Sequence, residues 1–239
     1  MNAIPAAFKG RMTSGRPTSA LPRIAVYVCV AATLATFVGC AASSPVHYYT
    51  LMADSHPAAD GVVSAGRREF DFTLMPIKIP AQVDQAALVL RIGSGQVAVL
   101  DNEQWAAPLG DELRSAFSDA LARRLGTTDV TSLPANARRP VVQITIDVQR
   151  FDLYNGNSTT LDVVWSARSL GSQAMHVATC KASLTERVAA QGYASLIEGQ
   201  QRAIGVIAMQ IASALTTWNG SDSPSCPALQ ETMGRSGAP

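Results

Sequence analysis

Cysteine is the residue type in this chain best suited to covalent chemistry, and one of the four cysteines, Cys40, follows an apolar run. Residues 24–39, IAVYVCVAATLATFVG, carry no charged side chain and end in Phe37-Val38-Gly39 directly before Cys40. Apolar and small residues before a cysteine are typical of the site at which a lipoprotein signal peptide is cut, although Phe37 and Val38 are bulkier than the commonest residues there. We predict that Cys40 is lipidated and begins the mature chain. The alternative is a plain secretory peptide beside an unmodified cysteine.

The segment before Cys40 has the charge pattern of a signal peptide. Residues 1–39 carry four basic side chains and no acidic one. A helix of residues 24–39 would rise only about 24 Å, which is short of the roughly 30 Å hydrocarbon core of a membrane. Translation can start at Met1 or at Met12, since both open such a segment. Ala41 stands where an aspartate would favour inner-membrane retention, so we expect a lipid anchor at the periplasmic face of the outer membrane.

Two further cysteines, Cys180 and Cys226, remain if residues 1–39, which include Cys29, are removed. An exported protein occupies an oxidising compartment. A bridge between the two would pin the tail to the strand that holds Cys180 and would stabilise the fold by about 4 kcal/mol in the chain-entropy model. We predict this bridge. The alternative is two unpaired thiols.

No other set of residues has a spacing typical of catalysis. His47, His56 and His176 share no metal-ligand spacing, and the sequence lacks HExxH, G-x-S-x-G and P-loop motifs. The net charge of +1 divides into +4 for residues 1–39 and therefore −3 for the remainder, which gives no electrostatic basis for nucleic-acid binding. We predict that the protein is not an enzyme, binds no metal or nucleic acid, and has no cofactor apart from covalent lipid on Cys40.

Hydrophobic periodicity indicates which elements follow Cys40. Strands are predicted over residues 46–51, 70–76, 88–92, 97–100, 141–151, 161–166 and 176–188, because apolar and polar residues alternate or β-branched residues gather there. Helices are predicted over residues 108–125 and 193–218, where apolar residues recur at intervals of three and four. Gly126 is the expected C-cap of the first helix.

The strand patterns predict a sheet with one buried face. We therefore expect an α+β fold: a mostly antiparallel sheet with two long amphipathic helices packed on one face. The predicted organisation is a lipoprotein signal peptide (1–39), a lipidated tether (40–45), a single α+β domain (46–218) and a mobile C-terminal tail (219–239).

Three aromatic residues are candidates for contact with a partner. Tyr48 and Tyr49 point to opposite faces if they lie in a strand, so one of them could face a partner. Trp105 stands just before the first helix, where an aromatic residue more often packs across the first turn than meets a ligand or partner. The polar side chains of residues 143, 145, 147 and 149 are most simply solvated, and a subunit contact is the alternative.

Two sequence pieces, SSPVHYYTL (43–51) and NEQWAAPL (102–109), stand in a fixed order with a later strand that ends in Arg150-Phe151. In that order they resemble the PqiC/YmbA family, the ABC-type transport auxiliary lipoproteins, over about residues 40–218. The family usually carries an arginine shortly before its tryptophan motif, and Arg91 stands in that place. The resemblance rests on the joint order of the pieces, since neither is a catalytic motif.

The resemblance implies a non-enzymatic part of a transport system that crosses the cell envelope and supports its integrity. Its expected partners are an MCE-domain protein and a multi-span membrane protein. The expected cargo of the system is a lipid or another apolar compound. Assembly of this chain into a homo-oligomer is also open. Two other functions stay open. One is a lipoprotein that activates a cell-wall synthase, and the other is a periplasmic lipoprotein that carries lipid in its own cavity.

Overall fold

The computed structural model describes residues 44–53, 70–133, 139–155, 158–170, 177–188, 190–218 and 226. Residues 45–239 form one compact unit. The predicted signal peptide, the lipidation site Cys40 and the predicted mobile tail, except for Cys226, lie outside the described residues.

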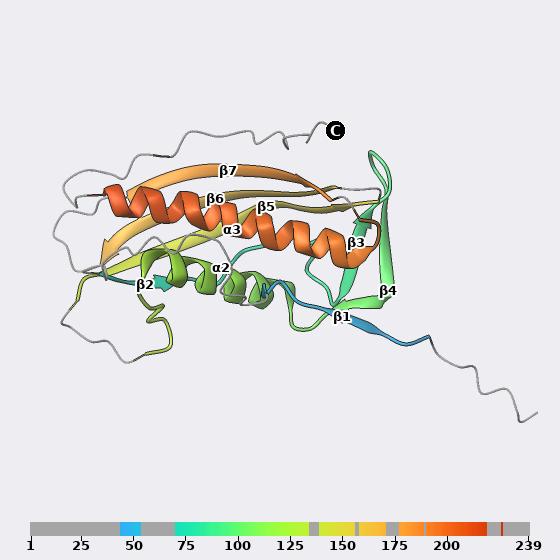
Figure 1. The fold of residues 1–239 in the computed structure, drawn as a ribbon, viewed down its shortest axis with the longest axis horizontal. Coiled ribbons are helices and arrows are strands. Elements are labelled where there is room, and N and C mark those ends of the chain that lie inside the picture. Colours follow the sequence, from blue (N-terminus) through green and yellow to red (C-terminus); the bar gives the residue numbers. More distant parts are fainter. Residues whose placement is uncertain are drawn as a thin grey trace, which may run out of the picture. The chain divides into compact units, whose positions relative to one another are not determined.

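Seven strands and two helices occur in the described residues (Figure 1). They are β1 (His47–Tyr49), β2 (Asp71–Leu74), β3 (Ala87–Arg91), β4 (Val97–Trp105), α2 (Leu109–Leu125), β5 (Val141–Tyr154), β6 (Ser158–Leu170), β7 (Val177–Arg187) and α3 (Tyr193–Thr217). Each lies where the sequence pattern predicts an element. The largest differences in bounds are in β4, which continues through the NEQW piece to Trp105, and in β6, which extends beyond the predicted residues 161–166 at both ends.

The strands form one sheet in the order β1-β4-β3-β5-β6-β7, and β2 also pairs with β5. The pairs β3–β4, β5–β6 and β6–β7 are antiparallel, whereas β1–β4, β3–β5 and β2–β5 are parallel. The α+β class is confirmed, but the prediction of a mostly antiparallel sheet is wrong in that the sheet is mixed. Alternation along a strand reports which face is buried, and it carries no information on the direction of the neighbouring strand.

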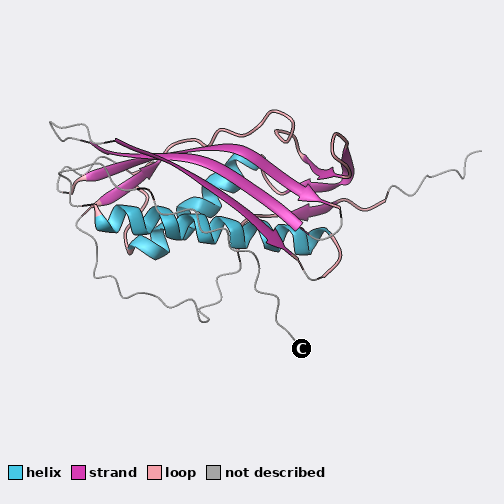
Figure 2. Ribbon diagram, turned by 90° about the horizontal axis from the view of Figure 1, so that it is seen from above, coloured by secondary structure: helices cyan, strands magenta, loops and turns pink. Residues whose placement is uncertain are grey.

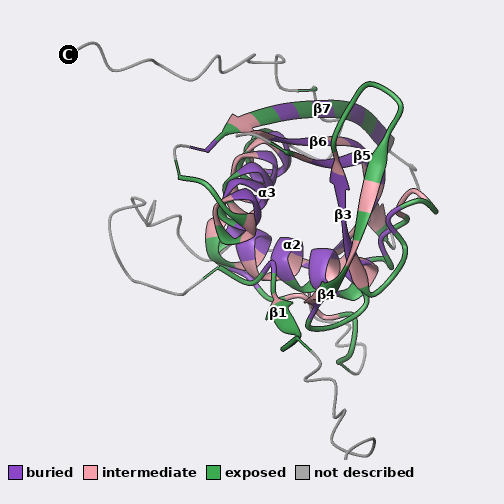
Figure 3. Cartoon of the chain, turned by 90° about the vertical axis from the view of Figure 1, so that its right-hand side faces the viewer, coloured by how far each residue is buried: buried purple, intermediate pink, exposed green. Residues whose placement is uncertain are grey.

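Both helices lie on the same face of the sheet (Figure 2). Leucines at positions 109, 113, 121 and 125 of α2, together with Phe117, are buried at 0–1% exposure, as the stripe of every fourth residue predicts. Helix α3 buries Ile197, Ile204, Ile207, Ile211 and Leu215. Viewed end on, the sheet bends around the two helices (Figure 3).

Local sequence fixes the ends of α2. Pro108 is the N-cap residue, and the amides of Asp111 and Glu112 both donate to its carbonyl oxygen. Gly126 adopts the left-handed conformation at φ 63°, and its amide donates to the carbonyl oxygen of Ala122 at 3.0 Å. A residue without Cβ is the usual choice there, so the predicted C-cap is confirmed.

A bulge changes the alternation of β5. Val142, Ile144, Ile146 and Val148 are buried, as predicted, and the register then shifts at Gln149, so that Val148 pairs with Val163 but Arg150 pairs with Asp162. Because of the extra residue, odd-numbered side chains face the core after the bulge, where even-numbered ones faced it before. Phe151 and Leu153 are therefore buried under the helices, and Arg150, Asp152 and Tyr154 are placed on the opposite face.

Candidate functional site at the junction of the tether strands and the main sheet

The sheet has two parts that meet over a short length. We call β1, β3 and β4 the tether strands and β2, β5, β6 and β7 the main sheet. Strand β3 pairs with β5 only where Leu90 meets Leu153 and Arg91 meets Tyr154, and the amide of Asn155 donates to the carbonyl oxygen of Arg91 at 2.9 Å. Side chains must supply the rest of the attachment. We call the five residues that do so most directly the junction: Arg91, Trp105, Glu112, Phe151 and Asp152.

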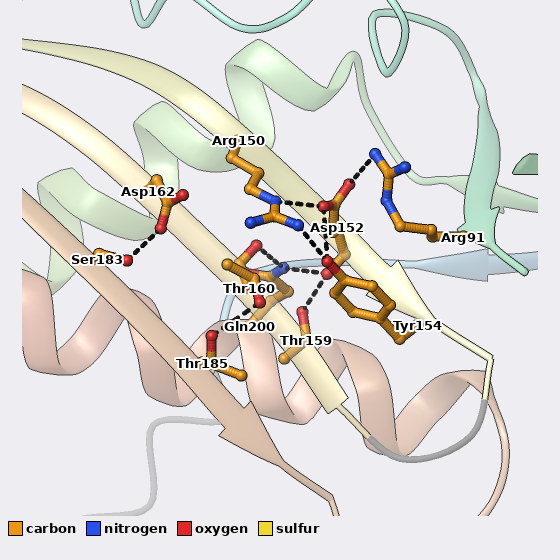
Figure 4. A network of polar contacts seen from close by, with 10 residues as sticks. All are labelled: Arg91, Arg150, Asp152, Tyr154, Thr159, Thr160, Asp162, Ser183, Thr185 and Gln200. Carbon is orange, nitrogen blue, oxygen red and sulfur yellow. Dashed lines mark hydrogen bonds and ion pairs between the residues drawn. The ribbon is translucent and has the colours of Figure 1, made fainter. Parts of the chain in front are cut away.

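Asp152 is the electrostatic centre of the junction (Figure 4). Its carboxylate is only 4% exposed and accepts hydrogen bonds from Arg91 Nη2 at 2.9 Å and Arg150 Nε at 2.5 Å. Burial alone would raise the pKa of Asp152, but the bonds from the two arginines outweigh it and hold that pKa below its usual value. Arg150 also donates to the hydroxyl of Tyr154. An ionised Asp152 therefore ties β3 to β5.

The backbone of Asp152 is held from the helix side. Thr159 Oγ1 donates to the Asp152 carbonyl oxygen at 2.8 Å, and the fully buried Gln200 donates through Nε2 to the same oxygen at 3.3 Å and to that of Thr160 at 3.2 Å. Figure 4 shows these contacts from β5, β6 and α3 meeting at one place. The strand region just after the bulge is thus fixed on both faces.

Trp105 lies in the core of the junction. Its ring meets that of Phe151 edge to face, with centroids 5.8 Å apart and planes at 74°. Its amide donates to the carbonyl oxygen of Ala86 at 2.8 Å. The Trp105 side chain is buried, so the structure gives it a packing role and no exposed surface for a partner.

The two pieces that carry the family resemblance lie side by side in space. Tyr48 pairs with Gln104 and Tyr49 with Trp105 in the parallel β1–β4 ladder. Tyr49 is half-buried and donates from its hydroxyl to Glu103 Oε2 at 2.6 Å, whereas Tyr48 is 66% exposed. Of the three candidate partner contacts, Tyr48 has the most exposed side chain.

Glu103 receives two side chains of β1. Besides Tyr49, His47 lies with Nδ1 3.0 Å from Glu103 Oε1. These two hydrogen bonds, that of Tyr49 first, lower the pKa of Glu103, and burial opposes them. Burial and the Glu103 carboxylate together raise the pKa of Tyr49 to about 12.

Glu112 attaches the segment after β1 to α2. Its Oε2 accepts from Thr50 Oγ1 at 2.7 Å and from the Leu51 amide at 2.8 Å. From α3, Gln201 Nε2 donates to the carbonyl oxygens of Thr50 and Met52, each at 3.1 Å. The sequence presents Glu112 as a first-turn acid that favours the helix dipole, and this signal conceals its second role as a buried acceptor for a distant strand.

The structure joins Cys180 of β7 to Cys226, with sulfurs 2.05 Å and Cα atoms 5.5 Å apart. This pair lies on the strand at the far edge from the tether strands. Within the described residues, no group of three or more His, Cys, Asp and Glu side chains is arranged to hold a metal ion. Neither described helix is both long and apolar enough to cross a membrane.

Among solved structures, one uncharacterised protein superposes with a TM-score of 0.57 at 16% identity, covering 72% of this chain and 99% of its own. A Xanthomonas campestris protein of family DUF330 superposes with a TM-score of 0.51 at 15% identity, covering 71% and 93%. No curated protein matches.

The family comparison covers most of the domain, including β5 to β7 and all five junction residues. The model for the ABC-type transport auxiliary lipoprotein component matches residues 49–212. That component is an auxiliary part of a transport system and not a known class of enzyme. The chain belongs to the family of ABC-type transport auxiliary lipoproteins.

Proposed function

We propose that this chain is a non-catalytic, lipid-anchored subunit that docks an MCE-domain transport assembly at the periplasmic face of the outer membrane. Family membership supports the auxiliary role in transport. The cargo of such an assembly is a lipid or another apolar compound, handed between the two membranes. The protein's own contribution is position: it holds its partners at a set distance from the lipid surface.

The observation that carries this proposal is the way β1 enters the fold. Only residues 41–46 separate Cys40 from β1, and six extended residues span at most about 20 Å. Strand β1 pairs with β4, and the residues after it are bonded to Glu112 of α2 and Gln201 of α3. A short tether that runs directly into a fixed strand restricts the domain to the neighbourhood of its anchor.

The anchor is tested by Cys40→Ser. The variant is expected to fold, because Cys40 precedes the compact unit 45–239, and to appear in the soluble periplasmic fraction. Two or more acyl chains hold a protein on a membrane stably, whereas an unlipidated chain has no such attachment. Retention of the variant on membranes after a high-salt wash would contradict the lipid anchor.

The partners are tested by affinity co-purification of the lipidated protein from gently solubilised envelopes, followed by mass spectrometry. An MCE-domain protein and a multi-span membrane protein are the expected companions. Recovery of a peptidoglycan synthase instead would favour an activator of cell-wall synthesis. Lipid bound to the purified protein, without such companions, would favour a carrier.

Tyr48 is the residue at which we place a partner contact, since its ring is exposed beside the fixed β1–β4 ladder. Tyr48→Ala is expected to reduce recovery of the MCE-domain partner about tenfold, as loss of an exposed aromatic anchor does at interfaces. Leu133→Ala, at an exposed apolar residue after α2, is the matched control and should leave recovery unchanged. Equal recovery with both variants would remove Tyr48 from the interface.

We also propose that the Cys180–Cys226 bridge forms in the exported protein and keeps the chain after α3 on β7. A thiol reagent added to the denatured, unreduced protein should label neither cysteine, and prior reduction should expose both. Labelling of both without reduction would refute the bridge.

A further inference from the structure

The hairpin that joins β3 to β4 exposes aliphatic side chains. Residues 92–99, IGSGQVAV, contain no charged residue. Ile92, Val97 and Val99 are 43–48% exposed. The Ile92 amide donates to the Gln96 carbonyl oxygen at 3.0 Å, which closes the turn. A closed, uncharged hairpin with three exposed branched side chains is typical of a contact surface and unusual for a tip that meets only water.

This hairpin lies at the end of the domain where the tether enters. Strand β4 runs from the hairpin to the position at which Glu103 pairs with His47, the first residue of β1. Figure 1 places the β3–β4 hairpin and β1 at its right-hand end, and Figure 3 shows them at opposite edges of that end, with β4 running between them. Val46, just before β1, is itself exposed.

We infer that the hairpin of residues 92–99 rests on the lipid surface in which Cys40 is anchored, with Ile92, Val97 and Val99 inserted at the boundary between headgroups and acyl chains. The inference depends on the anchor of the proposed function. From Glu103 to Val97, six strand residues span about 20 Å. The segment from Cys40 to β1 has the same maximum reach. One lipid surface can therefore meet both the acylated cysteine and the hairpin.

The chemistry of the hairpin suits a lipid surface. Amphipathic elements at membrane interfaces bury their apolar side chains about 5–10 Å deep. Residues 92–99 carry no charge that would have to be desolvated there. The ladder with Val97 opposite Arg91 and Val99 opposite Val89 satisfies backbone groups within the hairpin, which lowers the cost of contact with hydrocarbon. Arg91, at the base of the hairpin, is held away by its bond to Asp152.

Spin-label accessibility tests the contact. The lipidated protein carrying Val97→Cys is labelled with a nitroxide and reconstituted into vesicles of phosphatidylethanolamine and phosphatidylglycerol. Leu170→Cys is the matched control, because Leu170 is similarly exposed but lies where β6 pairs with Val141, about 40 Å along β5 from the junction. The unsubstituted protein, whose remaining cysteines are bonded, is the labelling blank.

On vesicles, the label at position 97 is expected to lose accessibility to a water-soluble nickel complex several-fold and to gain accessibility to oxygen, while the label at position 170 stays unchanged. Equal behaviour of the two labels would overturn the inference. So would protection of position 97 that appears only after the MCE-domain partner is added, because the hairpin would then be a protein contact. Val99→Cys repeats the test should Val97→Cys unfold.

Vesicle retention and the mass of the modified Cys40 are measured on the same samples. Retained protein with a water-exposed hairpin refutes the lipid contact alone and leaves the anchor standing. Protein that lacks lipid on Cys40 and washes off the vesicles refutes both the anchor and the hairpin contact.

Discussion

The tether strands and the main sheet are held together in different ways. In the main sheet, β5, β6 and β7 pair along nearly their whole lengths, from Val141–Tyr154 through Ser158–Leu170 to Val177–Arg187. The tether strands are shorter, and β3 meets β5 only at Leu90 and Arg91. Backbone ladders therefore stabilise the main sheet, whereas a few side chains at the junction attach the tether strands. Substitutions at the junction should loosen the tether strands first.

Trp105→Ala is expected to have the largest effect. Removing the buried ring should lower the free energy of unfolding by about 3–5 kcal/mol, because it leaves a cavity beside Phe151, at the end of β4 that pairs with Tyr49 of β1. Urea denaturation measures the loss, and amide exchange locates it. Exchange should accelerate more in β1 and β4 than in β6. Uniform acceleration would mean that the two parts of the sheet unfold as one. Trp105→Phe, which keeps a ring, should recover part of the loss.

Asp152→Asn keeps the side-chain shape but leaves Arg91 and Arg150 without their counter-charge. We expect a loss of about 2–3 kcal/mol at pH 7, below the range for fully buried pairs because both arginines are partly exposed. Asp162→Asn is the control, because Asp162 accepts a hydrogen bond from the neutral Ser183 and acts on Arg150 only at longer range, and it should cost less than about 1 kcal/mol.

The pH dependence of Asp152→Asn has a definite sign. The folded-state pKa of Asp152 is lowered, so its contribution is complete above the unfolded pKa of about 3.9 and is lost as pH falls through the folded value. The difference in stability between the native chain and the variant should therefore be constant above about pH 5 and shrink below about pH 4. A difference that does not change between pH 7 and pH 3 would show that the ion pairs contribute little.

Gly199→Ala tests the main sheet in place of the junction. A Cβ at position 199 would lie 2.7 Å from Thr159 Cγ2 and 3.0 Å from Val188 Cγ1, so α3 must move away from the sheet. We expect a loss of about 1–3 kcal/mol, with faster exchange in α3 and β6. Gly205→Ala is the control on the same helix, where an added Cβ would meet only Arg124 Nη2, at 3.9 Å. It should be neutral or stabilising by up to about 1 kcal/mol. Equal changes in stability for the two variants would mean that the close approach of Gly199 to Thr159 and Val188 does not limit the packing of α3 on the sheet.

The same difference between the two parts explains what the sequence could predict. The buried faces of β5, β6, α2 and α3 follow from periodicity, because a long element repeats its pattern often enough to be recognised. The strand directions cannot be predicted in this way, because a strand shows the same alternation beside a parallel or an antiparallel neighbour. Asp152 was not predicted to be a site residue, because the bulge at Gln149 changes which residues of β5 face the core after Val148. No residue type in that stretch is typical of a bulge. The family resemblance pointed to Arg91, and the ion pair between Arg91 and Asp152 explains physically why an arginine stands there.

Tyr49→Phe should have the smallest effect and sharpens the comparison at β1 itself. It removes the hydroxyl that donates to Glu103, so we expect a loss of about 1 kcal/mol at pH 8, where Tyr49 is protonated. The folded-state pKa of about 12 lies above the unfolded value of about 10, so the contribution of Tyr49 is complete below pH 10 and is lost as pH rises towards 12. The native chain should therefore approach the variant in stability over that range.

Tyr48→Phe, at a ring that is mostly in water, is the control and should change stability by less than about 0.5 kcal/mol at every pH. If the two variants behave alike, the Tyr49–Glu103 bond does not secure β1, and the attachment of the tether rests on Glu112 and Trp105.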